Sequence, residues 1–360
     1  MSEMEALSGF AMALPKVELH VHLEGSIQPA TLLELARRRR VDLPADAIDG
    51  LRRWFRFRDF EHFVEIYLTC CRCLRDPEDF QRVMEQFLAE QDRQNVLYSE
   101  VHFTIGTHLA NGANGDEVAA ALHETLAAAD KTGGARARLI PDIVRDVGPE
   151  QADQTLQWAL DGRQRGVVAL GLSGFESSPD DPFREHFRVA GEEGLRRVAH
   201  AGEHEGPSSI WSVLDVCQAE RIGHGIRAVD DPELVKELAG RGIPLEICPA
   251  SNVRLGAVSD LAEHPFDRLR RAGVTVTVNS DDPPQFETTI VDEYLNLART
   301  FDYGAAELAA FAWTAVQHAF LEPGERQGLE LEFQLQALAL GVAFEEGRLT
   351  IADESLAGLG

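Results

Sequence analysis

The feature that most constrains the fold of this chain is a regular alternation of short β-rich runs with stretches of helical pattern. An opening run at residues 17–24 is followed by seven more, at residues 96–103, 137–144, 167–172, 197–201, 221–224, 243–248 and 274–279. Helical patterns lie between most of them, at residues 117–131, 149–165, 182–193, 208–220, 232–240 and 265–272. Strands that alternate with helices pair in parallel through crossover connections. Eight such units can close into a (β/α)8 barrel.

Two architectures are compatible with this alternation, a closed (β/α)8 TIM barrel and an open doubly wound sheet. No G-x-G-x-x-G follows the first strand, which disfavours the open sheet. Two helical stretches at residues 305–319 and 326–340 follow the last strand, and we expect them to pack outside the barrel. The chain of 360 residues has no long linker, low-complexity tract or repeat. We therefore expect a single barrel domain over residues 1–360.

The first predicted strand reads V-E-L-H-V-H-L-E at residues 17–24. Successive side chains of a strand point to opposite faces, so Glu18, His20, His22 and Glu24 share one face. Neutral imidazole is a common zinc ligand, and two histidines two residues apart on a strand can reach the same ion. The alternative is a pair of hydrogen-bonded histidines at a strand end.

More polar side chains stand at the carboxyl ends of later strands. His200 and Glu203 lie at the end of the fifth, His224 at the end of the sixth, and Asp281 and Asp282 just after the eighth. In a barrel of this kind, reactive groups gather at the carboxyl ends of the strands. Any one of these residues could be a structural histidine or a capping carboxylate. Their common position predicts that they face one mouth of the barrel.

This set has the chemistry of metal-assisted hydrolysis. A zinc ion lowers the pKa of a bound water to about 7. His224 is placed to take or orient a proton of that water, and Glu203 is a carboxylate that can donate and accept protons. Asp282 adjoins a ligand and must point elsewhere, so it binds substrate or forms a turn before a proline. The four residues that can hold one Zn²⁺ are His20, His22, His200 and Asp281.

Composition narrows the range of partners. The formal net charge is −26 and the sequence pI is about 4.8, which disfavours nucleic-acid binding through a basic face. The sequence has neither an apolar run long enough to span a membrane nor a secretory signal. Five cysteines, an odd and sparse set, fit a reducing cytoplasm better than a disulfide framework. We expect a cytoplasmic enzyme with a small-molecule substrate, and the pattern leaves its oligomeric state open.

Five motifs resemble those of the adenosine deaminase family in the amidohydrolase superfamily. They are H-V-H-L-E-G-S at residues 20–26, H-A-G-E at 200–203, R-I-G-H-G at 221–225, C-P-A-S-N at 248–252 and N-S-D-D-P at 279–283. The resemblance covers about residues 14–344, in the family's order. It implies a (β/α)8 barrel, one zinc ion per chain, and hydrolytic deamination at C6 of a 6-aminopurine with release of ammonia.

The resemblance also implies a role for each candidate residue. Glu203 matches the group that protonates purine N1, and His224 matches the residue that activates the attacking water. Asp282 matches the carboxylate that binds N7. Gly174, in L-G-L-S-G-F-E, matches the glycine whose backbone N–H meets N3. The matched zinc ligands are again His20, His22, His200 and Asp281.

The substrate depends on two further features. Many adenosine-specific members carry Asp where this chain has Glu24, a position that faces the ribose. Adenine deaminases and 6-aminodeoxyfutalosine deaminases of menaquinone biosynthesis share the H-L-E-G form. The segment R-F-R-D-F-E-H-F at residues 56–63 also resembles the lid of those relatives. The aromatic-rich stretch 55–74 is either such a lid or a buried helix.

We therefore expect a deaminase of adenosine or an adenosine-like nucleoside, with 6-aminodeoxyfutalosine or adenine as the alternative substrate. A more distant alternative is an amidohydrolase acting on an amide, lactone or phosphoester. The fourth predicted strand ends in Leu172, Ser173 and Gly174, without a lysine to bridge two metals, which weighs against it. A non-catalytic barrel would have lost a ligand or a base, and every expected position is filled.

Overall fold

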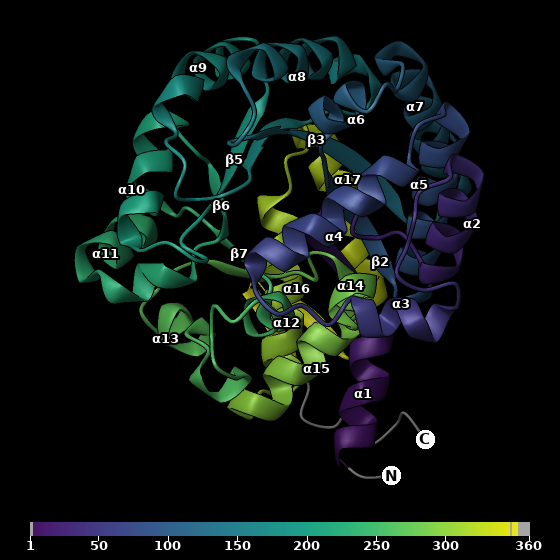
Figure 1. Ribbon diagram of the computed structural model, residues 1–360. Coiled ribbons are helices and arrows are strands. Elements are labelled where there is room, and N and C mark those ends of the chain that lie inside the picture. The colour runs from purple at the N-terminus through teal and green to yellow at the C-terminus, as the bar shows by residue number, and fades with distance from the viewer. Residues whose placement is uncertain (1–2, 346–347, 352–360) are drawn as a thin grey trace.

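The computed structural model describes residues 3–345 and 348–351 and shows an eight-stranded barrel surrounded by helices (Figure 1). Its strands pair in chain order, each parallel to the next. They are β1 (Lys16–His22), β2 (Val96–Phe103), β3 (Arg136–Val144), β4 (Ala169–Ser173), β5 (Arg196–Ala201), β6 (Arg221–His224), β7 (Leu245–Ile247) and β8 (Val276–Val278). The predicted TIM barrel is confirmed.

The segment just after β8 closes the ring against β1. A parallel bridge joins Val21 to Asp281. The backbone N–H of His22 donates to the Asp281 carbonyl at 2.9 Å, and the Asp281 N–H donates to the His20 carbonyl at 3.2 Å. Closure of the barrel therefore brings Asp281 next to both histidines of the first strand.

Helices cover the outside of the barrel. Helix α11 shows how local sequence sets the ends of a helix. The Asp231 side chain accepts from the backbone N–H groups of Glu233 and Leu234 at its start, and Gly242 ends it in the left-handed conformation. The helices that follow β1 to β6 are α2 (Pro29–Arg39), α3 (Ile48–Trp54), α4 (Phe60–Cys73), α5 (Pro77–Arg93), α6 (Ile105–Ala110), α7 (Gly115–Thr132), α8 (Pro149–Gly162), α9 (Arg184–Glu192), α10 (Pro207–Val216) and α11 (Pro232–Arg241). Those that follow β7 and β8 are α12 (Pro249–Arg254), α13 (Phe266–Arg271), α14 (Pro283–Phe286), α15 (Ile290–Phe301), α16 (Ala305–His318) and α17 (Pro323–Leu338). Short 3-10 helices are η1 (Arg163–Arg165), η2 (Asp181–Phe183), η3 (Ile226–Asp230) and η4 (Leu261–Glu263).

The structure adds elements that the sequence pattern did not predict. A helix α1 (Glu3–Ala13) precedes the barrel, and β9 (Val342–Glu345) pairs antiparallel with β10 (Arg348–Ile351) after α17. The aromatic-rich stretch 55–74 is not one helix, because the Asp59 side chain accepts from the His62 N–H at 2.8 Å and starts a new helix at Phe60. The part of the chain that is described contains no helix long and apolar enough to cross a membrane.

The interior of the barrel is unusually polar for a buried region. Parallel barrel strands are covered on both sides, and every residue of β1 is buried. Six ionisable side chains from three strands have no solvent exposure: Lys16, Glu18, His20, Glu100, His102 and Glu246. Buried polar groups of this kind require partners, and these partners lead to the site at the carboxyl ends of the strands.

Candidate active site

Four of the predicted side chains meet at the carboxyl ends of β1, β5 and β8. The Nε2 atom of His22 lies 3.2 Å from Nε2 of His200 and 3.2 Å from Oδ1 of Asp281. The Nε2 atom of His20 lies 3.6 Å from the same Asp281 oxygen. Residues separated by up to 261 positions in the sequence are thus within contact distance, as their shared position at strand ends predicted.

The spacing of these atoms fits a single metal ion. Bonds of about 2.0–2.1 Å from one ion place neighbouring nitrogen or oxygen ligands roughly 3–3.5 Å apart. The contacts that His22 makes with His200 and Asp281 fall in that range. The Nε2 atom of His20 is buried and has no hydrogen-bond partner among the described residues, which fits an atom reserved for a metal.

Three of the four candidate ligands are held from behind by another group, whereas Nδ1 of His22 has no hydrogen-bond partner among the described residues. Nδ1 of His20 lies 2.8 Å from Oε2 of Glu246, and Nδ1 of His200 lies 3.0 Å from a backbone carbonyl of β4. Ser251 donates its hydroxyl to Oδ2 of Asp281 at 2.6 Å. Such contacts fix the ring orientation and direct Nε2 of both histidines toward the shared centre.

The charges of the site call for a cation. Burial and the neighbouring imidazoles lower the pKa of His20 and of His200, so both are in the neutral form that binds metals. Burial also lowers the pKa of His22, but the carboxylates of Asp282 and Asp281 outweigh it and raise that pKa to about 10. The ionised carboxylate of Asp281, whose pKa is lowered by His22 and His224 despite its burial, also attracts a divalent ion.

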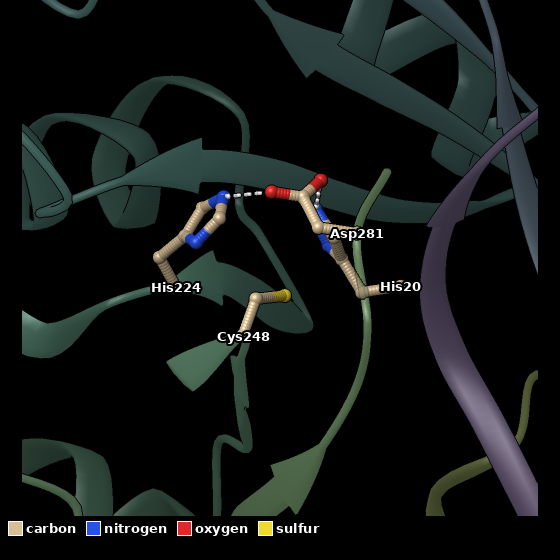
Figure 2. A group of neighbouring side chains, drawn as sticks. All are labelled: His20, His224, Cys248 and Asp281. Atoms are coloured by element: carbon tan, nitrogen blue, oxygen red, sulfur yellow. Dashed lines mark ion pairs between the residues drawn. The ribbon is translucent and has the colours of Figure 1, made fainter. Parts of the chain in front are cut away.

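A second group of potential ligands overlaps the first. Figure 2 shows the Asp281 carboxylate between His224 and His20, with the Cys248 sulfur directed toward them, and the ligand atoms of all four lie within 4.8 Å of one another. Burial raises the pKa of the Cys248 thiol well above its usual range. Because the thiolate is the form that ligates metals, the histidine set with Asp281 is the better match.

Next to the candidate metal centre lie an acid and a base. Asn252 on α12 donates its side-chain N–H to Oε1 of Glu203 at 2.8 Å and lies 3.1 Å from Nδ1 of His224. Burial and the Asp281 charge raise the pKa of Glu203 well above its usual range, which favours the protonated form of this carboxyl. Burial lowers the pKa of His224. A neutral carboxylic acid beside a neutral imidazole is suited to moving protons.

Two of the candidate residues have strained backbones. His224 has φ of 61° and Asp281 has φ of 63°, in the left-handed region that non-glycine residues rarely adopt. Each such residue costs about 1–3 kcal/mol, and such residues persist where the surrounding structure enforces them, often at functional sites.

Asp282 and Gly174 lie at the edge of the same site. Asp282 is buried, and its Oδ1 has no hydrogen-bond partner among the described residues. Burial and the adjacent Asp281 raise the pKa of Asp282 well above its usual range. A Cβ on Gly25 would overlap the Asp282 carboxyl, so this turn requires a glycine. Gly174 follows β4 with φ of 90° and lines the cavity described next.

A cavity of about 400 Å³ opens above the candidate residues. Its floor includes His22, Glu203 and Asp281, and α4, which crosses the barrel in Figure 1, lines it with Phe60 and Phe63. No lysine or arginine occurs among its described lining residues. A larger cavity of about 690 Å³ beside α17 contains none of the predicted site residues.

Glu24 is not in the lining of this cavity. Its carboxylate accepts hydrogen bonds from the backbone and hydroxyl of Thr104 at 2.8 and 2.6 Å, from His108 at 2.9 Å and from Tyr67 at 3.1 Å. Tyr67 does line the cavity. Direct contact of Glu24 with a substrate stays a prediction. In the structure, its carboxylate accepts a hydrogen bond from Tyr67 and so helps to hold that side chain.

Several residues of the site were not assigned from the sequence. Glu246 and Asn252 are described above, and His102 on β2 lies with its ring 4.5 Å from that of His20 and its Nδ1 2.9 Å from Asp142. The E-V-H alternation at residues 100–102 repeats that of the first strand and could have indicated His102. The motif C-P-A-S-N contains Asn252, but the motif alone does not indicate that Asn252 contacts Glu203 and His224.

Histidine and aspartate side chains gathered at the mouth of a TIM barrel, beside a neutral acid and a neutral imidazole, define the amidohydrolase class. The family model described as Adenosine deaminase matches residues 15–334. The chain therefore belongs to the adenosine deaminase family, as its motifs predicted, and it is a hydrolytic deaminase with a small aminopurine substrate.

Relatives with printed activities match over nearly the whole chain. Aminodeoxyfutalosine deaminase of Streptomyces avermitilis is 38% identical over 337 residues, which is 92% of this chain and 94% of that protein. Adenine deaminase of Streptomyces coelicolor is 38% identical over 315 residues, 87% of this chain and 92% of that protein. An amidohydrolase of Burkhoderia ambifaria, solved with bound Zn, has a TM-score of 0.84 and 26% identity, covering 94% of this chain and 96% of that one.

Proposed function

We propose that this protein is a zinc-dependent deaminase of 6-aminodeoxyfutalosine, which it converts to the 6-oxopurine product with release of ammonia. Adenine is the second candidate substrate. The relatives support these two substrates better than adenosine, which the motifs alone placed first. The H-L-E-G form at residues 22–25 supports the same choice.

The volume of the cavity favours 6-aminodeoxyfutalosine over adenine as the substrate. Its volume of about 400 Å³ is in the range of about 300–1,000 Å³ that holds a drug-sized ligand. A purine base is much smaller, so adenine would fill only part of the cavity. Its lining includes Phe60, Phe63 and Phe175, which suit an apolar extension of a nucleoside. Asp146 and Glu176 in the lining, with no lysine or arginine, disfavour a phosphate.

The proposed metal ligands are His20, His22, His200 and Asp281, with one zinc ion per chain. The zinc-bound relative supports this assignment, as do the contacts of His22 with His200 and Asp281 and of His20 with Asp281. Bound there, zinc would supply Lewis acidity that lowers the pKa of water to about 7.

The chain's own residues would move the protons. Glu203, protonated because burial raises its pKa, would donate to purine N1 and make C6 more electrophilic. His224, a neutral imidazole, would take or orient a proton of the attacking water. A C–O bond then forms at C6, the C6–N bond breaks, and the amine leaves as ammonia after receiving a proton.

Asp282 and Gly174 would hold the purine in place. Purine N7 is a hydrogen-bond acceptor, and a protonated Asp282 can donate to it, which agrees with the raised pKa of that carboxyl. The missing side chain of Gly174 allows the backbone to approach the ring at N3. Glu24 would act on the substrate through Tyr67, whose hydroxyl donates a hydrogen bond to the Glu24 carboxylate at 3.1 Å.

A substrate panel tests the proposal. The zinc-loaded protein is mixed with 6-aminodeoxyfutalosine, adenine, adenosine and AMP, and ammonia release and purine absorbance are followed. We expect the highest kcat/KM for 6-aminodeoxyfutalosine. Highest activity on adenine would replace it by the second candidate. Ammonia from none of the four would refute the proposed substrates, and a content of two metals per chain would refute the proposed single zinc site.

We also propose that residues 1–360 form a single domain that works in a reducing cytoplasm. One hydrophobic cluster extends from Leu7 on α1 through the barrel to Val342 on β9. The cysteines Cys70, Cys71, Cys73, Cys217 and Cys248 are all free and buried.

A further inference from the structure

The carboxylate of Glu176 is surrounded by donors from a neighbouring loop. Glu176 lies in the loop after β4, and it accepts hydrogen bonds from four consecutive backbone N–H groups after β5, those of residues 202–205, at 2.7, 2.9, 3.2 and 3.4 Å. The Ser209 hydroxyl at the start of α10 adds a fifth contact at 3.0 Å.

This arrangement makes the turn at residues 202–205 dependent on one side chain. Successive backbone N–H groups that point to one side form a concave site for an anion. Here the chain itself supplies the anion. An ionised carboxylate only accepts hydrogen bonds and can take about four, and charge-assisted bonds are roughly twice as strong as neutral ones. The Gly202 N–H also donates to the Ser209 hydroxyl at 2.8 Å, but without Glu176 the N–H groups of residues 203–205 would need other acceptors.

The turn held in this way carries Glu203. Gly202, just before it, has φ of 68°, and a Cβ there would overlap Ile210, so this position requires a glycine. From this turn the Glu203 side chain reaches Asn252 at 2.8 Å. A shift of the turn would therefore displace the carboxyl of Glu203.

The loop of Glu176 is itself anchored. Asp146, just after β3, accepts the backbone N–H of Phe175 at 2.9 Å and the hydroxyl of Ser178 at 2.7 Å. Thus the loop after β3 holds the loop after β4 through Asp146, and the loop after β4 holds the turn after β5 through Glu176. Gly174 lies on the same anchored loop, two residues before Glu176.

We infer that Glu176 is a positioning residue that aims Glu203 at the purine ring by holding the turn at residues 202–205. The inference rests on the proposed role of Glu203 as proton donor. It gives Glu176 a task of its own in a stretch, L-G-L-S-G-F-E, where the sequence marked only Gly174.

The first test replaces Glu176 by glutamine. Glu176→Gln keeps the size of the side chain, but its amide nitrogen cannot accept, so part of the turn loses its acceptor. A misplacement of about 1 Å can cost about 10²-fold in rate. We expect kcat to fall roughly 10- to 100-fold, with KM changed less than about 3-fold and zinc content unchanged. Glu176→Asp, which keeps the charge, should recover part of kcat. Glu185→Gln, the same chemical change on the exposed face of α9, is the matched control.

The second test asks whether the effect passes through Glu203. In a Glu203→Gln background, adding Glu176→Gln should lower kcat by less than about 3-fold, because residues that act as a unit are not additive. A separate readout needs no turnover. Hydrogen exchange of a peptide covering residues 200–210 should be faster in zinc-loaded Glu176→Gln than in the wild type.

The outcomes separate this inference from the proposed function. A kcat for Glu176→Gln within 3-fold of wild type, a full additional loss in the Glu203→Gln background, or unchanged hydrogen exchange would each overturn it. If Glu176→Gln does not fold, the same three measurements are made on Glu176→Asp. A wild type that deaminates nothing in the panel refutes the proposed function instead, and the hydrogen exchange still tests whether Glu176 holds the turn.

Discussion

Replacing Glu246 by glutamine tests whether His20 is a metal ligand held from behind. Glu246 on β7 has Oε2 2.8 Å from Nδ1 of His20 and Oε1 2.5 Å from Nε of Arg221. All three side chains are buried. The carboxylate would fix the imidazole in the tautomer whose Nε2 faces the metal and would increase its basicity.

The magnitude follows from what glutamine keeps and what it loses. Its carbonyl can still accept from Nδ1 of His20, but the charge that makes this bond strong is gone. Loss of such a partner typically costs 10- to 100-fold in metal affinity, or about 1.4–2.7 kcal/mol. Arg221 keeps its contact with Glu100, so the variant does not leave a buried cation unpaired and should fold.

The assay is a zinc titration against a chromophoric chelator, starting from metal-free protein. Burial raises the pKa of Glu246 to about 7 although Arg221 opposes this, so the titration is run at pH 8, where the wild-type side chain is ionised. Glu233→Gln, the same change in an exposed pair with Lys236 on α11, is the control. A folded Glu246→Gln protein that binds zinc within 3-fold of wild type would refute the reasoning, because His20 would then not depend on its partner.

Three further predictions concern single residues of the site. Glu203→Gln should keep its zinc and lose about 10²-fold or more in kcat, and unchanged turnover would exclude Glu203 as the acid. Asp281→Ala should lower the zinc content measured by elemental analysis, whereas a full complement would contradict its role as ligand. For Glu24, burial raises the pKa, but His108 and Thr104 outweigh burial and lower it from 4.5 to about 2. A carboxyl whose pKa is lower in the folded state stabilises the fold above its unfolded pKa and loses this effect as the pH falls. Urea unfolding should therefore show Glu24→Gln less stable than wild type by about 3 kcal/mol at pH 7 and at pH 5, with a smaller gap at pH 4 and pH 3, and a gap that stays constant to pH 3 would refute this.

The barrel could be predicted because its signals are local. Strand alternation and crossover helices are readable in short windows, and the bounds predicted for β2 and β6, residues 96–103 and 221–224, are those of the structure. Helix α1 was missed because the stretch E-M-E-A-L-S-G-F-A-M-A has apolar residues on more than one side and shows no clear period. The bounds of β7 and β8 were set too wide, since buried strands end where pairing ends and not where apolar residues end.

The site was predictable only where it coincides with strand ends. His20, His22, His200 and Asp281 could be chosen because the fold itself gathers such positions. Glu246 could not, since its task depends on a contact with His20 across 226 positions of sequence. Glu176 was missed for the same reason, because its acceptor role appears only when two loops lie side by side.

The cavity is lined by proposed catalytic groups held by the barrel and by side chains of α4. These two sets differ in how far they can change without loss of stability, which bears on how one fold accepts several substrates. The proposed catalytic groups are tied into the barrel through buried chains of contacts, such as His20 to Glu246 to Arg221, so changing them costs stability as well as activity. Phe60 and Phe63, which also line the cavity, belong to α4 and not to the ring of strands. Side chains there can change without disturbing the deaminating centre. Two relatives that each share 38% identity with this chain carry different names, an adenine deaminase and an aminodeoxyfutalosine deaminase. Substrate preference in this family should therefore be decided on α4 and the loops that face it, and the chemistry on the strands.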